Sequence, residues 1–177
     1  MGDEDPTPDR RKFLKLATCG VGGAVGLAVA VPALSLVVHP SRAQTVTTPK
    51  DPIDVGPSSL LAPEWRKVDV IAPEVRDAWV TARNVVLGAA WLRKPDKSDQ
   101  VQALSAVCPH LGCPVSWEGA KNQFLCPCHD SHFRADGERG DGPAKRGLDP
   151  LPIVIKDGRL RLTWVQYKLD RKSRDPA

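Results

Sequence analysis

The most marked apolar pattern is an uncharged run near the N-terminus, at residues 16–38. This run is longer than a signal-peptide core, which spans about 7–15 residues. A helix of that length suffices to cross a hydrocarbon layer of ~30 Å. Basic residues precede the run, so its N-terminal side is expected in the cytoplasm and the rest of the chain on the other side. The pattern predicts a single-pass membrane anchor over 16–38.

Alternation of apolar and polar residues begins near Glu64 and is typical of short β-strands. The stretch 78–91 is interrupted by Asn84 and Gly88, so it predicts either two strands or one bent strand. Asp157-Gly158 separates two alternating runs and predicts a tight hairpin turn, because both turn residues must adopt positive φ. The predicted strands are 65–70, 78–91, 101–107, 123–125, 151–156 and 159–165. With no helical period in this part, the pattern predicts an all-β fold built as an antiparallel sandwich.

The remaining stretches lack an apolar period. Residues 39–63 contain several prolines among polar residues and predict a semi-stiff linker, which would act as a hinge. The predicted organisation is a cytoplasmic tail (1–15), an anchor (16–38), the linker (39–63), a folded domain (64–168) and a charged, frayed tail (169–177).

Composition narrows the class of protein. The chain of 177 residues has 17 prolines and few aromatic residues, which agrees with a loop-rich β domain. The net charge of +4 is mild and spread along the chain. Basic and aromatic residues do not interleave as they do in single-strand binders, so we predict no nucleic-acid partner. No phosphate-binding loop, nucleotide fingerprint or nucleophile–base set is present.

Two short boxes carry the chemistry. The first reads Cys108-Pro-His110-Leu-Gly-Cys113, and the second reads Cys126-Pro-Cys128-His129-Asp-Ser131. Each box pairs one cysteine with one histidine at close spacing, and thiolates with imidazoles can hold a metal centre. The other cysteine of each box, Cys113 or Cys128, occupies a matching place beside these candidate ligands.

The two boxes resemble those of the Rieske iron–sulfur proteins, C-x-H-x-G-C followed by C-P-C-H-x-S. The resemblance implies a [2Fe–2S] cluster in which two histidines replace two cysteines on one iron. It also implies a Rieske-type sandwich with a small cluster-binding subdomain, at about 107–146. By this resemblance Cys108 and Cys126 bind the inner iron, His110 and His129 bind the outer iron, and Cys113 and Cys128 form a disulfide.

Other readings of the boxes compete with this one. Cys2His2 sets are common zinc ligands, although zinc sites usually pair like with like, as C-x-x-C and H-x-x-x-H. Alternatively, the histidines merely fill a core. The mixed boxes and the two spare cysteines disfavour both alternatives.

Residues near the boxes bear on cluster tuning. The resemblance implies that Ser131 donates its hydroxyl to a cluster sulfur and that a loop with Gly142 and Pro143 shields the cluster. Phe133 stands where the family often has a tyrosine that bonds a cysteine sulfur, and Asp130 stands where glycine is usual. Both departures predict a lower reduction potential, which would suit a low-potential quinol such as menaquinol. Lys145 replaces a proline often found in the family, so we expect a less stiff loop.

Arg10-Arg11-Lys-Phe-Leu-Lys resembles a twin-arginine export signal, a route that carries folded proteins. A disulfide also requires an oxidising compartment. We therefore predict a bacterial membrane protein with its globular domain on the periplasmic side. The triplet Ser41-Arg42-Ala43 leaves open a cleaved signal, although the length of the apolar run favours a retained anchor.

The resemblance implies the iron–sulfur subunit of a quinol–cytochrome c reductase, within a dimeric cytochrome bc complex. In that role His110 or His129 takes a proton from quinol while the cluster takes an electron, and a c-type cytochrome is reduced next. The other partner is a cytochrome b subunit. Alternatives are the small subunit of an arsenite oxidase-type molybdoenzyme and, less favoured because of the cysteine pair and the export signal, an aromatic-ring oxygenase or its ferredoxin.

Overall fold

The computed structural model describes residues 7–42, 51–76, 80–96 and 98–177, which form two units. The first unit contains helix α1, Thr7–Arg42. Within it, Asp9–Val38 is the stretch of the described chain that is long and apolar enough to cross a membrane. Its apolar side chains are exposed, Leu16 and Leu27 among them, as expected for a helix whose solvent is lipid. These features fit the predicted single-pass anchor.

The helix differs from the prediction at both ends. It begins at Thr7, so part of the predicted tail is helical, and it continues to Arg42 into the predicted linker. Arg10 and Arg11 lie within its first turns. The predicted cleavage triplet ends at Ala43, which lies outside the described residues. Residues 43–50 of the predicted linker lie outside them too.

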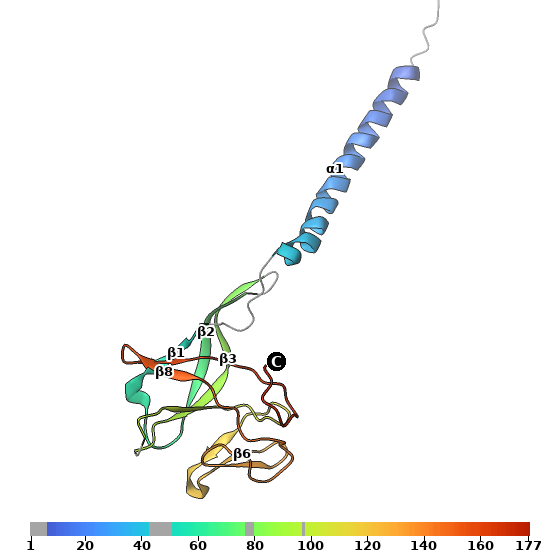
Figure 1. Cartoon of the computed structure of the whole chain (residues 1–177). Helices are drawn as coiled ribbons and strands as arrows, with labels where there is room; N and C mark the ends of the chain where they lie inside the picture. The colour runs from blue at the N-terminus through green and yellow to red at the C-terminus, as the bar shows by residue number, and fades with distance from the viewer. Residues whose placement is uncertain (1–6, 43–50, 77–79, 97) are drawn as a thin grey trace, which may run out of the picture. The chain divides into compact units, whose positions relative to one another are not determined.

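The second unit is built from strands, so the predicted all-β class is confirmed (Figure 1). Its described part forms three antiparallel sheets, in the orders β1-β9-β8, β2-β3-β4 and β5-β6-β7. The third sheet lies at one end of the unit, as expected for a separate subdomain. The strands are β1 Ile53–Pro57, β2 Arg66–Arg76, β3 Thr81–Arg93, β4 Gln102–Ser105, β5 Ser116–Glu118, β6 Gln123–Cys126, β7 Ser131–Arg134, β8 Ile153–Lys156 and β9 Arg159–Leu162. Two short 3-10 helices, η1 Ser58–Leu60 and η2 Gly119–Lys121, complete the described elements.

Two features of the strands that the sequence predicted have local causes in the backbone. Asp157 and Gly158 have φ of 52° and 71° between β8 and β9, so the predicted hairpin turn is confirmed. Strand β3 is continuous, which settles the choice in favour of one bent strand. Asn84 in it has a positive φ of 53°, and the register with β2 shifts near Val70, as at a β-bulge.

The predicted start of the domain at Glu64 is wrong. Strand β1 lies inside the predicted linker and pairs with β9, with Ile53 opposite Leu162. Ile53 is buried, and Asp54 forms ion pairs with Arg159 and Arg161. The prolines around this segment gave no strand pattern in the sequence. Its pairing partner, β9, lies about a hundred residues further along the chain, so no local signal predicted the strand.

Two apolar clusters hold the sheets together. One lies between the first two sheets and includes Val70, Leu92 and Leu160. The other joins the β5–β7 sheet to β3 and β4 and includes Trp91, Phe124 and Phe133. The Trp91 indole N–H donates to the Val115 carbonyl at 3.1 Å, so one side chain of β3 is tied to the chain that leads into β5. The segments that contain the two cysteine–histidine boxes pack on this second cluster.

The predicted frayed tail is also wrong. Residues 169–177 fold back on the segment before them, with a bridge between Tyr167 and Pro176. The Lys168 N–H donates to the Asp175 carbonyl and the Ala177 N–H donates to the Gln166 carbonyl, both at 2.9 Å. The charged residues are exposed, as the sequence suggested, but these hydrogen bonds tie the backbone of the segment to the fold.

Candidate metal centre

The first box forms a tight loop after β4. The Gly112 N–H donates to the Cys108 carbonyl at 2.9 Å, and the Cys108 N–H donates to the Cys113 carbonyl at 2.8 Å. Gly112 has a φ of 83°, a conformation that glycine adopts without steric cost. Residues 108–113, termed loop 1, are therefore closed by their own backbone.

The second box is the connection between β6 and β7. Cys126 and Ser131 are paired across these two strands, so residues 127–130 form the hairpin turn. We term residues 126–131 loop 2. Asp130 has a φ of 54°, a left-handed conformation that glycine adopts freely and that aspartate tolerates. The sequence predicted no strand directly after the second box, whereas Ser131–Arg134 form strand β7.

The fold brings the two loops together. The His110 and His129 rings have centroids 4.9 Å apart and planes at 85°. Cys113 and Cys128 form a disulfide. The Cys126 sulfur lies within 4.8 Å of both disulfide sulfurs. We do not take these three sulfurs as a ligand set, because two of them are bonded to each other.

The remaining two thiols of the boxes are buried. Cys108 and Cys126 are each 1% exposed. The pKa of Cys108 is raised to about 11, chiefly by burial and also by Cys126, while hydrogen bonds from the backbone amides of His110 and Leu111 oppose the rise. A thiol with this pKa is protonated at neutral pH, so only a bound metal ion would keep it as thiolate. The two amides are directed at the sulfur and would stabilise that thiolate.

Exposure divides the donors into two layers. The thiols of Cys108 and Cys126 are buried, His110 is half-buried and His129 is exposed. A centre held this way has a dry thiolate side and an imidazole side open to a partner. The donor set of two thiols and two imidazoles therefore fits a two-iron centre with unequal ligands.

A further loop lies against loop 2. Ser131 is fully buried, and its Oγ accepts a hydrogen bond from the Ala144 N–H at 3.4 Å. Its hydroxyl proton remains available for another acceptor. Gly142 has a φ of 93°. A Cβ at Gly142 would lie 2.5 Å from the Asp130 carbonyl oxygen, so only glycine permits this approach.

Arg139 is a functional residue that sequence reasoning missed. Its guanidinium donates to the carbonyls of Ala144 and Gly142, the second at 2.8 Å. It thereby fixes the loop around Pro143, whose side chain is exposed. The arginine four residues before Pro143 was the available signal, because an Arg fork suits two nearby carbonyl acceptors.

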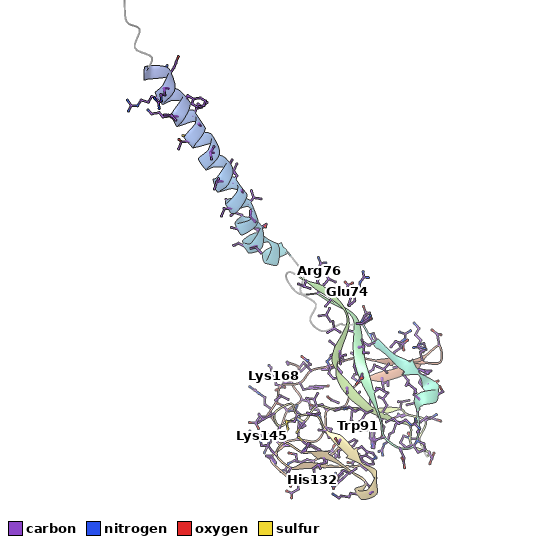
Figure 2. All side chains as sticks on the ribbon, turned by 180° about the vertical axis from the view of Figure 1, so that it is seen from behind. Glu74, Arg76, Trp91, His132, Lys145 and Lys168 are labelled. Atoms are coloured by element: carbon purple, nitrogen blue, oxygen red, sulfur yellow. A yellow bond between two sulfur atoms is a disulfide. The ribbon has the colours of Figure 1, made fainter. Side chains whose placement is uncertain are left out.

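The two tuning candidates lie in different surroundings. Phe133 is 1% exposed and is paired with Phe124 across β6 and β7. The Asp130 side chain is 84% exposed, and its Oδ1 lies 3.0 Å from the His132 Nε2. Figure 2 shows His132 on the β5–β7 end of the unit. The third histidine of the region thus contacts the turn of loop 2, a role that the sequence left unassigned.

Comparisons with known proteins cover both loops. The family model described as Rieske [2Fe-2S] domain matches residues 69–153. The menaquinol:cytochrome c reductase iron-sulfur subunit of Geobacillus thermodenitrificans is 34% identical over 166 residues, which are 92% of this chain and 95% of that protein. The protein of the same name from Bacillus subtilis (strain 168) is 32% identical over 157 residues, 86% of this chain and 90% of that protein. Cytochrome b6-f complex iron-sulfur subunit 2 of Synechocystis sp. is 30% identical over 177 residues, 97% of this chain and 93% of that protein.

Proposed function

Because the chain belongs to the Rieske [2Fe–2S] family, we propose that it is the membrane-anchored iron–sulfur subunit of a quinol–cytochrome c reductase. The single observation that carries this proposal is similarity over 92% and 86% of the chain to two menaquinol:cytochrome c reductase subunits. In this role it accepts one electron, together with a proton, from a quinol and passes the electron to a c-type cytochrome. Menaquinol is the proposed donor.

We assign the ligands from burial and proximity. Cys108 and Cys126, the buried thiols, hold the inner iron, and His110 and His129, the neighbouring imidazoles, hold the outer iron. When bound, the cluster supplies a one-electron acceptor. The Cys113–Cys128 disulfide joins the loops that carry these four donors.

The imidazoles do the proton chemistry. Each histidine ring has a second nitrogen that does not bind iron, and this nitrogen can accept a hydrogen bond from a quinol hydroxyl and then its proton. The partial exposure of His110 and the exposure of His129 give a substrate access to that edge. The thiols are buried away from water, and in this role the loop around Pro143 shields the cluster. Ser131 raises the potential through its hydroxyl, whereas Phe133, which has no hydroxyl to donate, and the carboxylate of Asp130 keep it lower.

Localisation and partners extend the proposal. The apolar helix is a single-pass anchor, and Arg10 and Arg11 serve as a twin-arginine signal that exports the folded domain to the periplasmic side. The relatives are named as subunits of reductase and b6-f complexes, which supports a cytochrome b subunit and a c-type cytochrome as partners in a dimeric complex. The same names disfavour the alternative of an arsenite oxidase subunit.

The test is purification of the full chain from native membranes. We expect iron and acid-labile sulfide in equal amounts, two of each per chain, and the electron paramagnetic resonance signal of a Rieske centre on reduction. Co-purification of a dihaem cytochrome b supports the reductase. A molybdenum subunit in its place would refute the reductase, and zinc without iron would refute the cluster.

A further inference from the structure

We propose that residues 165–177, termed the strap, hold loop 1 against the chain beside loop 2, with Lys145 and Asp170 as positioning residues. The importance of this geometry rests on the proposed function, because loop 1 carries His110 and loop 2 carries His129. The contacts themselves do not depend on it.

The strap binds loop 1 at its centre. The Asp170 N–H donates to the Pro109 carbonyl at 2.9 Å, and Pro109 stands between the candidate ligands Cys108 and His110. Beside it, a Leu169 methyl lies 3.2 Å from the position that a Cβ on Gly112 would take. One hydrogen bond therefore ties the backbone of loop 1 to the strap, and the Leu169 side chain lies close beside Gly112.

The same strap residue also binds the chain beside loop 2. The Lys145 ammonium donates to an Asp170 carboxylate oxygen at 2.8 Å and to the Asp170 carbonyl at 3.1 Å. Lys145 directly follows Ala144, whose N–H is bonded to Ser131 in loop 2. Asp170 therefore connects both loops through one residue, by its N–H on one side and its carboxylate and carbonyl on the other.

Arg146 anchors the strap to the body of the unit. Its guanidinium forms a two-pronged ion pair with Asp149, both contacts at 2.8 Å, and both side chains are almost fully buried. A third nitrogen donates to the carbonyls of Lys168 and Arg171 at 3.0 and 2.8 Å. Charge-assisted, two-pronged bonds of this kind give geometric precision, and these two carbonyls flank Asp170.

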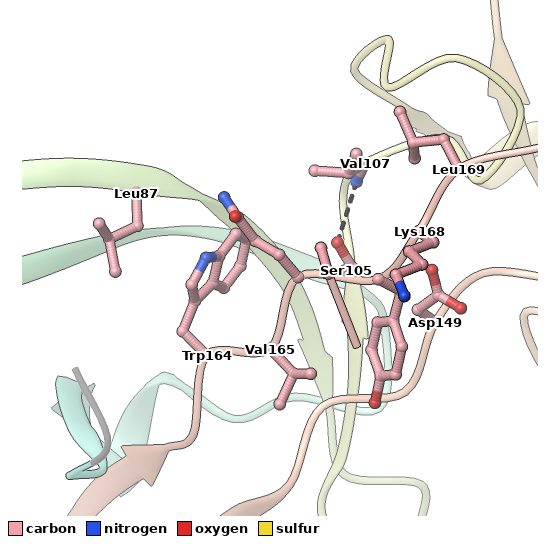
Figure 3. A pocket seen from close by; sticks show the side chains of 11 residues that line it. Leu87, Ser105, Val107, Asp149, Trp164, Val165, Lys168 and Leu169 are labelled. Carbon is pink, nitrogen blue, oxygen red and sulfur yellow. Dashed lines mark hydrogen bonds between the residues drawn. The ribbon is translucent and has the colours of Figure 1, made fainter. Parts of the chain in front are cut away.

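A cavity shows why the polar contacts matter. About 360 Å³ of open space lies along the strap and against β3 and β4, bordered by Leu87, Val107, Trp164 and Leu169 (Figure 3). Lys168 and Asp149 lie at the same cavity. Side-chain packing is incomplete here, so hydrogen bonds and the ion pairs determine where Leu169 and Asp170 sit. Lys145 and Lys168 lie on the same side of the unit (Figure 2).

The first test replaces Asp170 by asparagine. Asparagine keeps the backbone N–H and tolerates the positive φ of 54° at this position. It removes the charge that attracts Lys145. We expect hydrogen exchange at the Cys108 and Gly112 amides to accelerate about two- to fivefold, and release of iron to a chelator to accelerate with it. The denaturant midpoint of global unfolding should stay unchanged, which separates positioning from general stability.

Matched variants sharpen the test. Lys145→Met should reproduce the effect, and the double variant should exchange no faster than either single one, because both remove the same interaction. Lys172→Met, at an exposed strap position without an ion pair among the described residues, should change nothing. Unaltered exchange in both Asp170→Asn and Lys145→Met would overturn the proposal. Exchange is read at the amides in the full chain, so this result stands whether or not the chain contains iron.

Discussion

Gly142 brings the chain that follows loop 2 back against the backbone of the loop. Its positive φ is one requirement, and the closeness of Asp130 and Ser131 is a second. Gly158 satisfies only the first, because its φ is also positive but nothing lies within 4 Å of a Cβ placed there. The two glycines therefore separate backbone strain from steric contact.

We predict that Gly142→Ala is more damaging than Gly158→Ala. The strain at Gly158 costs about 1–2 kcal/mol. At Gly142 the added methyl must also displace backbone atoms, so the loss rises to about 3 kcal/mol, and the iron content of the purified protein falls. Urea unfolding and iron analysis measure these effects. Equal losses for the two variants would show that contact with loop 2 has no cost.

Phe133 provides a prediction on redox tuning. A tyrosine at this position offers a hydroxyl donor near the cysteine sulfurs, and such a donor stabilises the more negative, reduced cluster. Phe133→Tyr should raise the midpoint potential by roughly 40 mV, equivalent to about 1 kcal/mol for one electron. Potentiometric titration followed by electron paramagnetic resonance measures it.

The control for this variant is Phe133→Leu, which removes the ring without supplying a donor and should not raise the potential. A midpoint unchanged by tyrosine would remove the argument from the missing hydroxyl. Asp130 contributes less than its sequence position suggested, because its carboxylate is exposed and bonded to His132, and water screens such a charge.

At the scale of elements, one carboxylate couples the first and last strands of the chain, which are neighbours in one sheet. Asp54 on β1 accepts two hydrogen bonds from Arg159 on β9, one of them at 2.8 Å. The side-chain bond from Arg159 lowers the pKa of Asp54 below its usual 3.8. A carboxyl with a lowered pKa in the folded state stabilises the fold above the unfolded value and loses this contribution as the pH falls through the folded value.

We therefore predict that Asp54→Asn destabilises the β unit at neutral pH and that the difference from the unsubstituted chain shrinks below about pH 4. Urea unfolding at a series of pH values measures this. Asp69→Asn, at an exposed position on β2, is the control and should leave the pH profile unchanged. A constant difference at every pH would rule out the charge of Asp54 as the cause.

The elements that sequence predicted correctly are those with local causes. The β8–β9 hairpin follows from Asp157-Gly158, and the bend in β3 follows from Asn84 and Gly88. Strand β1 and the strap had no such signal. Ile53 is buried only because Leu162 lies opposite it, and residues 169–177 are ordered only because loop 1 and Arg146 offer hydrogen-bond partners.

The metal centre also has a part that the sequence predicted and a part that it did not. The boxes predicted the cysteine pairing and the two histidines that approach each other, because family motifs fix their spacing. They did not predict Arg139, Arg146 or Asp170, each of which donates to backbone carbonyls: those of Arg139 lie in its own loop, and those of Arg146 and Asp170 lie in distant segments. Every residue has a backbone carbonyl, so the sequence does not indicate which carbonyl will accept a hydrogen bond. Motifs therefore miss the side chains that bind carbonyls.

At the scale of the whole molecule, the chain separates into a helical unit and a β unit. We predict that the full chain resists extraction from membranes by alkaline carbonate, whereas a chain that starts at Val46 is soluble and keeps its iron. Fractionation and iron analysis test both statements. A mature N-terminus at Gln44 would instead show that the helix is a cleaved signal.

The disulfide between the two loops imposes an order on how this protein is made. Once Cys113 and Cys128 are joined, the loops cannot part, and the two thiols beneath them are each 1% exposed. Iron and sulfide that arrive afterwards would have to reach thiols that the protein already buries. Metal insertion is therefore easiest while Cys113 and Cys128 are still reduced, and oxidation afterwards would tie the two loops together over a cluster already in place.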